Sequence, residues 1–171
     1  MQPLSAETSA LVIVDYQNDF CHPDGAFGRA GHDLSAVQAV AVPIARLRDQ
    51  AHEAGVPVVV VRVEHSSWTD DAIWLRRFEG LLPEARPTEQ VAARGSWGAE
   101  LFHLKPDDRD FEVVKHRYSA FAYTPLALVL RARGCTDVVI CGVQTDVCVL
   151  GTARDALQVG FRPVVVSDAV A

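Results

Sequence analysis

Five short apolar runs, most of them rich in β-branched residues, recur along the 171-residue chain and limit what it can fold into. They span residues 10–14 (ALVIV), 57–63 (PVVVVRV), 111–115 (FEVVK), 138–141 (VVIC) and 162–167 (RPVVVS). Continuous apolar runs of this length are typical of strands that are buried on both faces of a parallel sheet. Helical patterns lie between them, so strand–helix–strand units are predicted. The expected fold class is a three-layer α/β/α domain with a mostly parallel sheet.

The helical patterns have recognisable starts and ends. Apolar residues recur every three or four positions over residues 33–55, which predicts a helix ended by Gly55. Pro43 lies inside this pattern and is expected to kink or split the helix. Another helix is predicted where the capping hydroxyl of Thr124 is followed by Pro125.

Two segments show no sustained period. Residues 16–33 are polar and rich in glycine, so they are predicted to form a loop at the carboxyl end of the first strand. Residues 64–95 are too long for an ordinary connection, and connections of this length are usually functional or mobile. A lid, a subunit contact and a surface excursion with its own short helix are the alternatives for them.

Composition and charge narrow the function classes. The chain is 49% hydrophobic and 22% charged, which suits one domain over residues 1–171. A net charge of −6 and scattered basic residues argue against nucleic-acid binding. The N-terminal residues lack the pattern of a signal peptide or membrane span, so no membrane partner and a cytoplasmic location are expected. Cysteines at positions 21, 135, 141 and 148 show no paired spacing, which predicts reduced thiols.

The stretch over residues 138–149, VVICGVQTDVCV, carries the most reactive pattern. Gly142 ends the fourth predicted strand, and Thr145 and Asp146 are expected to cap the next helix. Cys148 then falls in the first turn, where free N–H groups and the positive end of the helix dipole lower the pKa of a thiol. Cys148 is therefore a candidate nucleophile, and a buried structural cysteine is the alternative.

Two charged residues stand at the carboxyl ends of predicted strands, where open α/β sheets bind ligands. Asp15 follows the first strand and Lys115 ends the third. If the strand order brings them to Cys148, Lys115 would hold the thiolate charge, while Asp15 would take the thiol proton and later deliver it to a leaving nitrogen. Backbone N–H groups around Gln144 and Cys148 would bind the oxyanion. The structural alternatives are a loop-capping carboxylate at Asp15 and a solvated strand-end charge at Lys115.

Three blocks of the sequence resemble one family in the same order and spacing. They are LVIVDYQNDF, VVKHRYSAFAYTPL and VVICGVQTDVCVLGTARDALQVGFRPVVVSDA. The chain resembles the isochorismatase-like cysteine hydrolases, which include nicotinamidases, N-carbamoylsarcosine amidases, biuret hydrolases and ureidoacrylate amidohydrolases. The resemblance implies a catalytic triad of Asp15, Lys115 and Cys148, and a cis peptide between Val143 and Gln144 that makes the Gln144 N–H an oxyanion donor beside that of Cys148. It also implies a six-stranded sheet in the order 3-2-1-4-5-6 and a homodimer or homotetramer.

The chain departs from the family in two places. Nicotinamidases that bind a metal carry an Asp-x-His element and a further histidine after the second strand. This chain reads VRVEHSSWTD there, with His65 beside Glu64, so no metal site and no cofactor are expected. Relatives also continue beyond Ala171 through another helix and strand.

The substrate expected from this pattern is a small planar amide, carbamoyl or ureido compound. The segment RGSWGAEL before KPDDRDFEVVKHRYSAF is most similar to ureidoacrylate and related hydrolases. Candidate substrate contacts are Phe20, Asn18, Trp68, Arg117 and Tyr118, although an ion pair that braces the strand end is the alternative for Arg117. Cys148 favours carbon–nitrogen hydrolysis through a thioester. Isochorismatase-type cleavage of a vinyl ether and a non-catalytic binding role are the competing interpretations.

Overall fold

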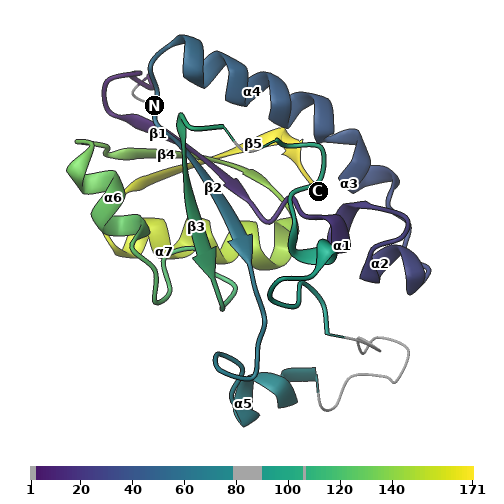
Figure 1. Cartoon of the computed structure of the whole chain (residues 1–171). Coiled ribbons are helices and arrows are strands. Elements are labelled where there is room, and N and C mark those ends of the chain that lie inside the picture. The colour runs from purple at the N-terminus through teal and green to yellow at the C-terminus, as the bar shows by residue number, and fades with distance from the viewer. Residues whose placement is uncertain (1–2, 79–89, 106) are drawn as a thin grey trace.

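A single parallel sheet forms the centre of the computed structural model, which describes residues 3–78, 90–105 and 107–171 (Figure 1). The sheet has five strands in the order β3-β2-β1-β4-β5. They are β1 Ser9–Val14, β2 Val58–Val63, β3 Asp110–Lys115, β4 Asp137–Gly142 and β5 Arg162–Val170. The five predicted runs and the order 3-2-1-4-5 are confirmed, while the implied sixth strand is not part of the sheet over the described residues.

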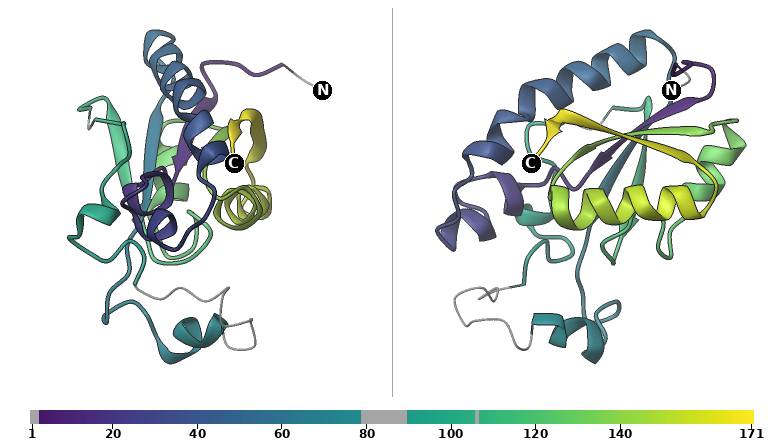
Figure 2. Two further views of the ribbon diagram at one scale, coloured as in Figure 1. Left: turned by 90° about the vertical axis from the view of Figure 1, so that its right-hand side faces the viewer. Right: turned by 180° about the vertical axis from the view of Figure 1, so that it is seen from behind.

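Helices cover both faces of the sheet, as Figure 2 shows. Helices α3 (Ser35–Ala39) and α4 (Ala41–Glu53) lie on one face, and α6 (Leu126–Ala132) and α7 (Leu150–Gln158) lie on the other. Alternate residues of β1 enter different cores: Val12 packs with residues of α6 and α7, whereas Ile13 packs with residues of α3 and α4. Because successive side chains of β1 face opposite cores, both faces of the strand are buried and its sequence is a continuous apolar run. The predicted three-layer class is confirmed.

The helix predicted over residues 33–55 is split, as Pro43 suggested. Val40 separates α3 from α4, and Pro43 is the third residue of α4. The first N–H groups of a helix have no partner inside it, so a proline in this turn removes no helical hydrogen bond. At the other end Gly55 takes a left-handed φ of 68° and ends the helix.

Helix α6 is where it was predicted, but it starts one residue later, because Pro125 is the N-cap and not the first helical residue. The Thr124 hydroxyl accepts a hydrogen bond from the Leu126 N–H at 3.2 Å, and Pro125 occupies the position just before the helix. Within the described residues no helix combines the length and the apolar character that crossing a membrane requires.

Residues 16–33 do not form the predicted loop throughout. They contain two short helices, α1 (Asn18–Cys21) and α2 (Ala26–Arg29). The buried carboxylate of Asp19 holds them, since it accepts hydrogen bonds from the N–H groups of Ala26 at 2.9 Å and Ala92 at 2.7 Å. A side-chain contact of this kind leaves no period in the sequence, so the pattern could not reveal it.

Part of the long connection 64–95 is an arm, which we define as residues 64–78. It carries α5 (Ala72–Leu75) and a short 3-10 helix at Arg76–Phe78, and it projects beyond the carboxyl ends of the strands (Figures 1 and 2). The interpretation as an excursion with its own short helix is confirmed for the arm, while its use as a lid or subunit contact stays a prediction. Residues 79–89 of this connection lie outside the described residues.

Candidate active site

Three reactive side chains from distant parts of the chain meet at the carboxyl end of the sheet. Asp15 directly follows β1, Lys115 is the last residue of β3, and Cys148 lies in the turn after β4. The Lys115 ammonium is 2.7 Å from Asp15 Oδ2 and 3.3 Å from Cys148 Sγ. The sequence left open whether the strand order would bring these three residues together, and it does. Strand β2 lies between β3 and β1, and the side chain of Lys115 crosses the end of β2 to reach the ends of β1 and β4.

The Lys115–Asp15 pair is deeply buried. Lys115 is 0% exposed and Asp15 is 1% exposed. The ammonium has three acceptors, because it also donates to the backbone carbonyl of Arg117 at 2.9 Å. Among the described residues the Asp15 carboxylate accepts no backbone N–H, and its ion pair with Lys115 is its main contact. Asp15 is therefore neither a loop-capping residue nor solvated.

Burial and charge shift the three pKa values together. Burial raises the pKa of Asp15, against the opposing charge of Lys115. Burial raises the pKa of Cys148 to about 12, reinforced by the negative charge of Asp15. Burial opposes the charged form of Lys115, but Asp15 and Cys148 outweigh it and the pKa of Lys115 is raised. The predicted lowering of the thiol pKa is therefore wrong for the resting site, because burial and a neighbouring carboxylate outweigh the helix dipole.

The turn that carries Cys148 is shaped by close approach to β1. Gly142 has a φ of 115°, and a Cβ atom there would lie 2.1 Å from the carbonyl oxygen of Val14. The peptide between Val143 and Gln144 is cis, as the family resemblance implied.

The helix start after this turn differs from the prediction. Residues Thr145–Val149 form a π-helical turn, in which the Val149 N–H donates to the Gln144 carbonyl at 3.1 Å. Gln144 is the N-cap, and its side chain makes no capping hydrogen bond to the described residues, so the predicted capping by Thr145 and Asp146 is wrong. The Thr145 N–H instead donates to the carbonyl of Ala171 at 2.8 Å, which ties the turn to the end of β5.

Gln17 is a supporting residue that the sequence did not single out. Its side chain is 0% exposed and makes three hydrogen bonds: it donates to the carbonyls of Val63 at 2.9 Å and Ala99 at 2.8 Å, and accepts from the Val63 N–H at 2.8 Å. It therefore joins the segment after Asp15 to the end of β2. Its only sequence signal is a polar residue directly after a buried strand.

The five candidate substrate contacts occupy different environments. The Asn18 side chain donates to the Trp97 carbonyl at 2.9 Å, and Phe20 packs edge-on against Phe27. Trp68 is 90% exposed, so its indole does not belong to the buried site. Tyr118 lies against the ring of Trp74, with 4.7 Å between ring centroids.

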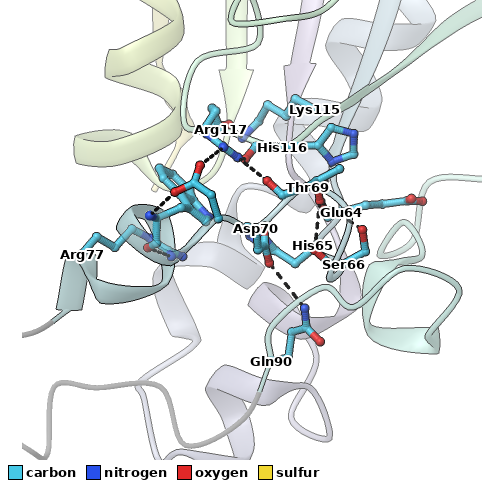
Figure 3. A network of polar contacts seen from close by, with 12 residues as sticks. Glu64, His65, Ser66, Thr69, Asp70, Arg77, Gln90, Lys115, His116 and Arg117 are labelled. Atoms are coloured by element: carbon cyan, nitrogen blue, oxygen red, sulfur yellow. Dashed lines mark hydrogen bonds and ion pairs between the residues drawn. The ribbon is translucent and has the colours of Figure 1, made fainter.

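Arg117 makes the ion pair that the sequence offered as its alternative. Its guanidinium contacts Asp71 Oδ2 at 2.9 Å. It also donates to the Thr69 carbonyl at 3.0 Å (Figure 3). Substrate contacts by Arg117 and the other four residues stay predictions.

Glu64 and His65, which lie where metal-binding nicotinamidases carry their ligands, each contact an oppositely charged or polar side chain. His65 Nδ1 is 3.0 Å from Asp70 Oδ1, and Glu64 is 2.9 Å from Arg62. Within the part of the chain that the structure describes, no cluster of three or more His, Cys, Asp or Glu side chains is arranged to hold a metal ion.

Comparison with known proteins places this geometry in a family. The model of the isochorismatase domain matches residues 9–171. The chain belongs to the isochorismatase family. Its relatives include the ureidoacrylate amidohydrolase RutB of Methylobacterium radiotolerans, which is 35% identical over 97% of this chain and 68% of the relative. The RutB of Azorhizobium caulinodans is 33% identical over 98% of this chain and 79% of the relative.

Solved structures of isochorismatase-like hydrolases share the fold. A cysteine hydrolase from Pseudomonas syringae pv. phaseolicola superposes with a TM-score of 0.85 at 29% identity, covering 100% of this chain and 76% of that chain. N-carbamoylsarcosine amidase from Thermoplasma acidophilum gives a TM-score of 0.77 at 34% identity, covering 96% of this chain and 84% of that chain. The family resemblance read from the three sequence blocks is confirmed, and the chain is an isochorismatase-like cysteine hydrolase.

Proposed function

We propose that this protein hydrolyses a carbon–nitrogen bond of a small amide, carbamoyl or ureido substrate through a thioester on Cys148. The observation that carries the proposal is the single ammonium of Lys115, which lies 2.7 Å from a buried carboxylate and 3.3 Å from a thiol. The class of reaction is hydrolysis of carbon–nitrogen bonds other than peptide bonds, in keeping with the amidohydrolase and amidase relatives.

The first half-reaction forms the thioester. The thiol proton of Cys148 moves to Asp15 as the sulfur attacks the substrate carbonyl carbon, and the carbonyl oxygen becomes an oxyanion. We assign the backbone N–H groups of Gln144 and Cys148 as its donors. Asp15 then gives the proton to the leaving nitrogen, the carbon–nitrogen bond breaks, and ammonia or an amine departs.

The second half-reaction releases the acid. Asp15 takes a proton from water, whose oxygen attacks the thioester carbon. The carbon–sulfur bond breaks, and the proton returns to the sulfur of Cys148. Lys115 contacts both groups between which the proton moves, so its charge stabilises the anion in either position.

A ureido or carbamoyl substrate is the narrower proposal. Relatives named ureidoacrylate amidohydrolase are 32–35% identical to the chain, and one named N-carbamoylsarcosine amidase is 34% identical. The cysteine at the nucleophile position favours attack on a carbonyl over cleavage of a vinyl ether.

The test is release of ammonia or amine from a panel of small amides, carbamoyl compounds and ureides. Cys148→Ala is expected to abolish turnover, while Cys135→Ala, which alters a buried cysteine outside the site, retains it. Acid quenching followed by mass spectrometry should detect an acyl group on the peptide that contains Cys148. Conversion of isochorismate that survives Cys148→Ala, or turnover without an acylated Cys148, would contradict the proposal.

Assembly and location belong to the same proposal. We expect a homodimer or homotetramer in the cytoplasm, where the free cysteines 21, 135, 141 and 148 would stay reduced. Sedimentation of the purified chain under reducing conditions measures the subunit number, and a monomer at all concentrations would refute it.

A further inference from the structure

The third acceptor of the Lys115 ammonium belongs to a residue with an unusual set of contacts. The Arg117 carbonyl accepts from Lys115 Nζ at 2.9 Å. The side chain of the same residue reaches the arm, where it donates to the Thr69 carbonyl at 3.0 Å and to Asp71 Oδ2 at 2.9 Å. Figure 3 shows the dashed contact from Arg117 to Thr69, with Lys115 close to Arg117. Arg117 therefore touches both the reactive ammonium and the arm.

The neighbouring residue strengthens the same connection. His116 Nδ1 lies 2.7 Å from the Glu64 carbonyl, and the Glu64 N–H donates to the Lys115 carbonyl at 3.0 Å. The guanidinium of Arg117 also lies 4.8 Å from the centroid of the Trp74 ring on the arm. The peptide of Arg117 is thus held from the arm side by polar contacts and by a cation–π contact.

The segment that follows Lys115, residues 116–120, also packs against α7, the helix after Cys148. The Ala120 N–H donates to Thr152 Oγ1 of α7 at 3.0 Å. A Cβ atom on Gly151 would lie 3.6 Å from Tyr118 Cβ, so the loop packs closely on the first turn of α7. The Arg117 peptide is fixed between α7 and the arm, and its carbonyl is aimed at Lys115.

We propose that Arg117 is a positioning residue, which uses its clamp on Thr69 and Asp71 to hold its own carbonyl against the Lys115 ammonium. The inference rests on the proposed function, in which Lys115 must stay close to Cys148 and Asp15. An ammonium has three N–H donors, and the carbonyl is the one acceptor of the three that takes no part in the chemistry. Without the contact to the Arg117 carbonyl, the end of the Lys115 side chain would be free to turn. Its ammonium would then no longer be held in contact with both Asp15 and Cys148.

The composition of the chain allows a direct readout of this ammonium. Only two lysines are present, Lys105 and Lys115, and Lys105 is exposed. Nitrogen-15 labelling of lysine should give a proton-coupled ammonium signal from Lys115, because burial and three acceptors slow its exchange with water, whereas exposed Lys105 exchanges too fast to be seen. Lys115→Met identifies the signal by removing it.

Arg117→Gln is expected to broaden or abolish the Lys115 signal, and Asp71→Asn to weaken it in the same direction while its side-chain oxygen still caps α5. The matched control is Arg109→Gln, since Arg109 also pairs with an aspartate, Asp107, but lies away from the site. The control should keep the signal. An unchanged Lys115 signal in folded Arg117→Gln would overturn the proposal.

Kinetics separate this inference from the proposed function. With a substrate from the panel, Arg117→Gln should lower kcat by roughly 10- to 100-fold, with KM changed by no more than about twofold. Arg109→Gln should leave both unchanged. A rise in KM with kcat unchanged would show substrate binding by Arg117 and overturn the positioning role. If the wild-type protein turns over no substrate, the proposed function fails, while the ammonium signal still decides whether Arg117 holds Lys115.

Discussion

Replacing Lys115 by methionine is the sharpest test of the buried charge pair. The substitution keeps an unbranched apolar stem as long as that of lysine up to Cε, and it removes the ammonium that contacts Asp15 Oδ2 at 2.7 Å. Asp15 is 1% exposed and accepts no backbone N–H among the described residues, so its charge would be left without compensation. Breaking a buried pair in this way typically costs about 3–5 kcal/mol of unfolding free energy.

The dependence of this loss on pH has a definite sign. The charge of Lys115 opposes the effect of burial on Asp15, so its removal raises the pKa of folded Asp15 further above the unfolded value. A folded state that binds the proton more tightly gains stability as pH falls. The deficit of Lys115→Met should therefore be smaller at pH 5 than at pH 8. In the wild type the pKa of Lys115 is raised above its ordinary value of 10.5, so its stabilising contribution is present below that pH and lost as pH rises through the folded value.

Urea denaturation at the two pH values measures these effects, and a second variant isolates their cause. Asp15→Asn combined with Lys115→Met removes both charges, and asparagine tolerates the left-handed φ of 50° at position 15. We expect the double variant to recover at least about half of the loss, because no buried charge remains. The reasoning is refuted if Lys115→Met is as stable as the wild type, or if the double variant is less stable than Lys115→Met at pH 8.

Two further substitutions test the frame around the site. Gly142→Ala should lower the unfolding free energy by more than about 2 kcal/mol, because its φ is 115° and the new Cβ would meet Val14 O at 2.1 Å. Gly160→Ala is the control, because its φ of 92° is also left-handed but its new Cβ would meet no described atom outside the adjacent residues within 4 Å. The control should cost about 1–2 kcal/mol in the same urea titration. Gln17→Leu should lower the unfolding free energy by about 2–4 kcal/mol and reduce turnover, because the Val63 N–H and carbonyl lose their buried partner. A thermal melt and an activity assay measure these effects. An unchanged melting temperature would contradict the structural role given to Gln17.

The sequence predicted the parts of the fold that repeat a local pattern. The apolar runs fix the strands, and the position of Asp15 and Lys115 at strand ends is enough to place both at one edge of a parallel sheet. The proline in the first turn of α4 and the hydroxyl before α6 left equally local signals. These features depend on residues that are close in sequence, so the sequence alone is enough to predict them.

Features that depend on distant residues were missed. The short helices α1 and α2 rest on Asp19, whose partners include an N–H more than seventy residues away. The thiol pKa was predicted from the helix end that carries Cys148, but it is set by burial and by a carboxylate that follows β1. The contact between Arg117 and the arm likewise joins segments that no periodic pattern connects.

The raised pKa values of Asp15 and Cys148 are compatible with the proposed chemistry because one cation contacts both groups. In the proposed transfer the proton passes from Cys148 to Asp15, and the negative charge passes from Asp15 to the sulfur. Lys115 Nζ lies 2.7 Å from the first position of that charge and 3.3 Å from the second, so the ion pair is exchanged and not broken. Burial disfavours both anions in the same direction, and the cost of the transfer is therefore set by the difference between the two pKa values. A cation that contacted only the carboxylate would oppose the transfer, which is why the orientation of Lys115 matters as much as its presence.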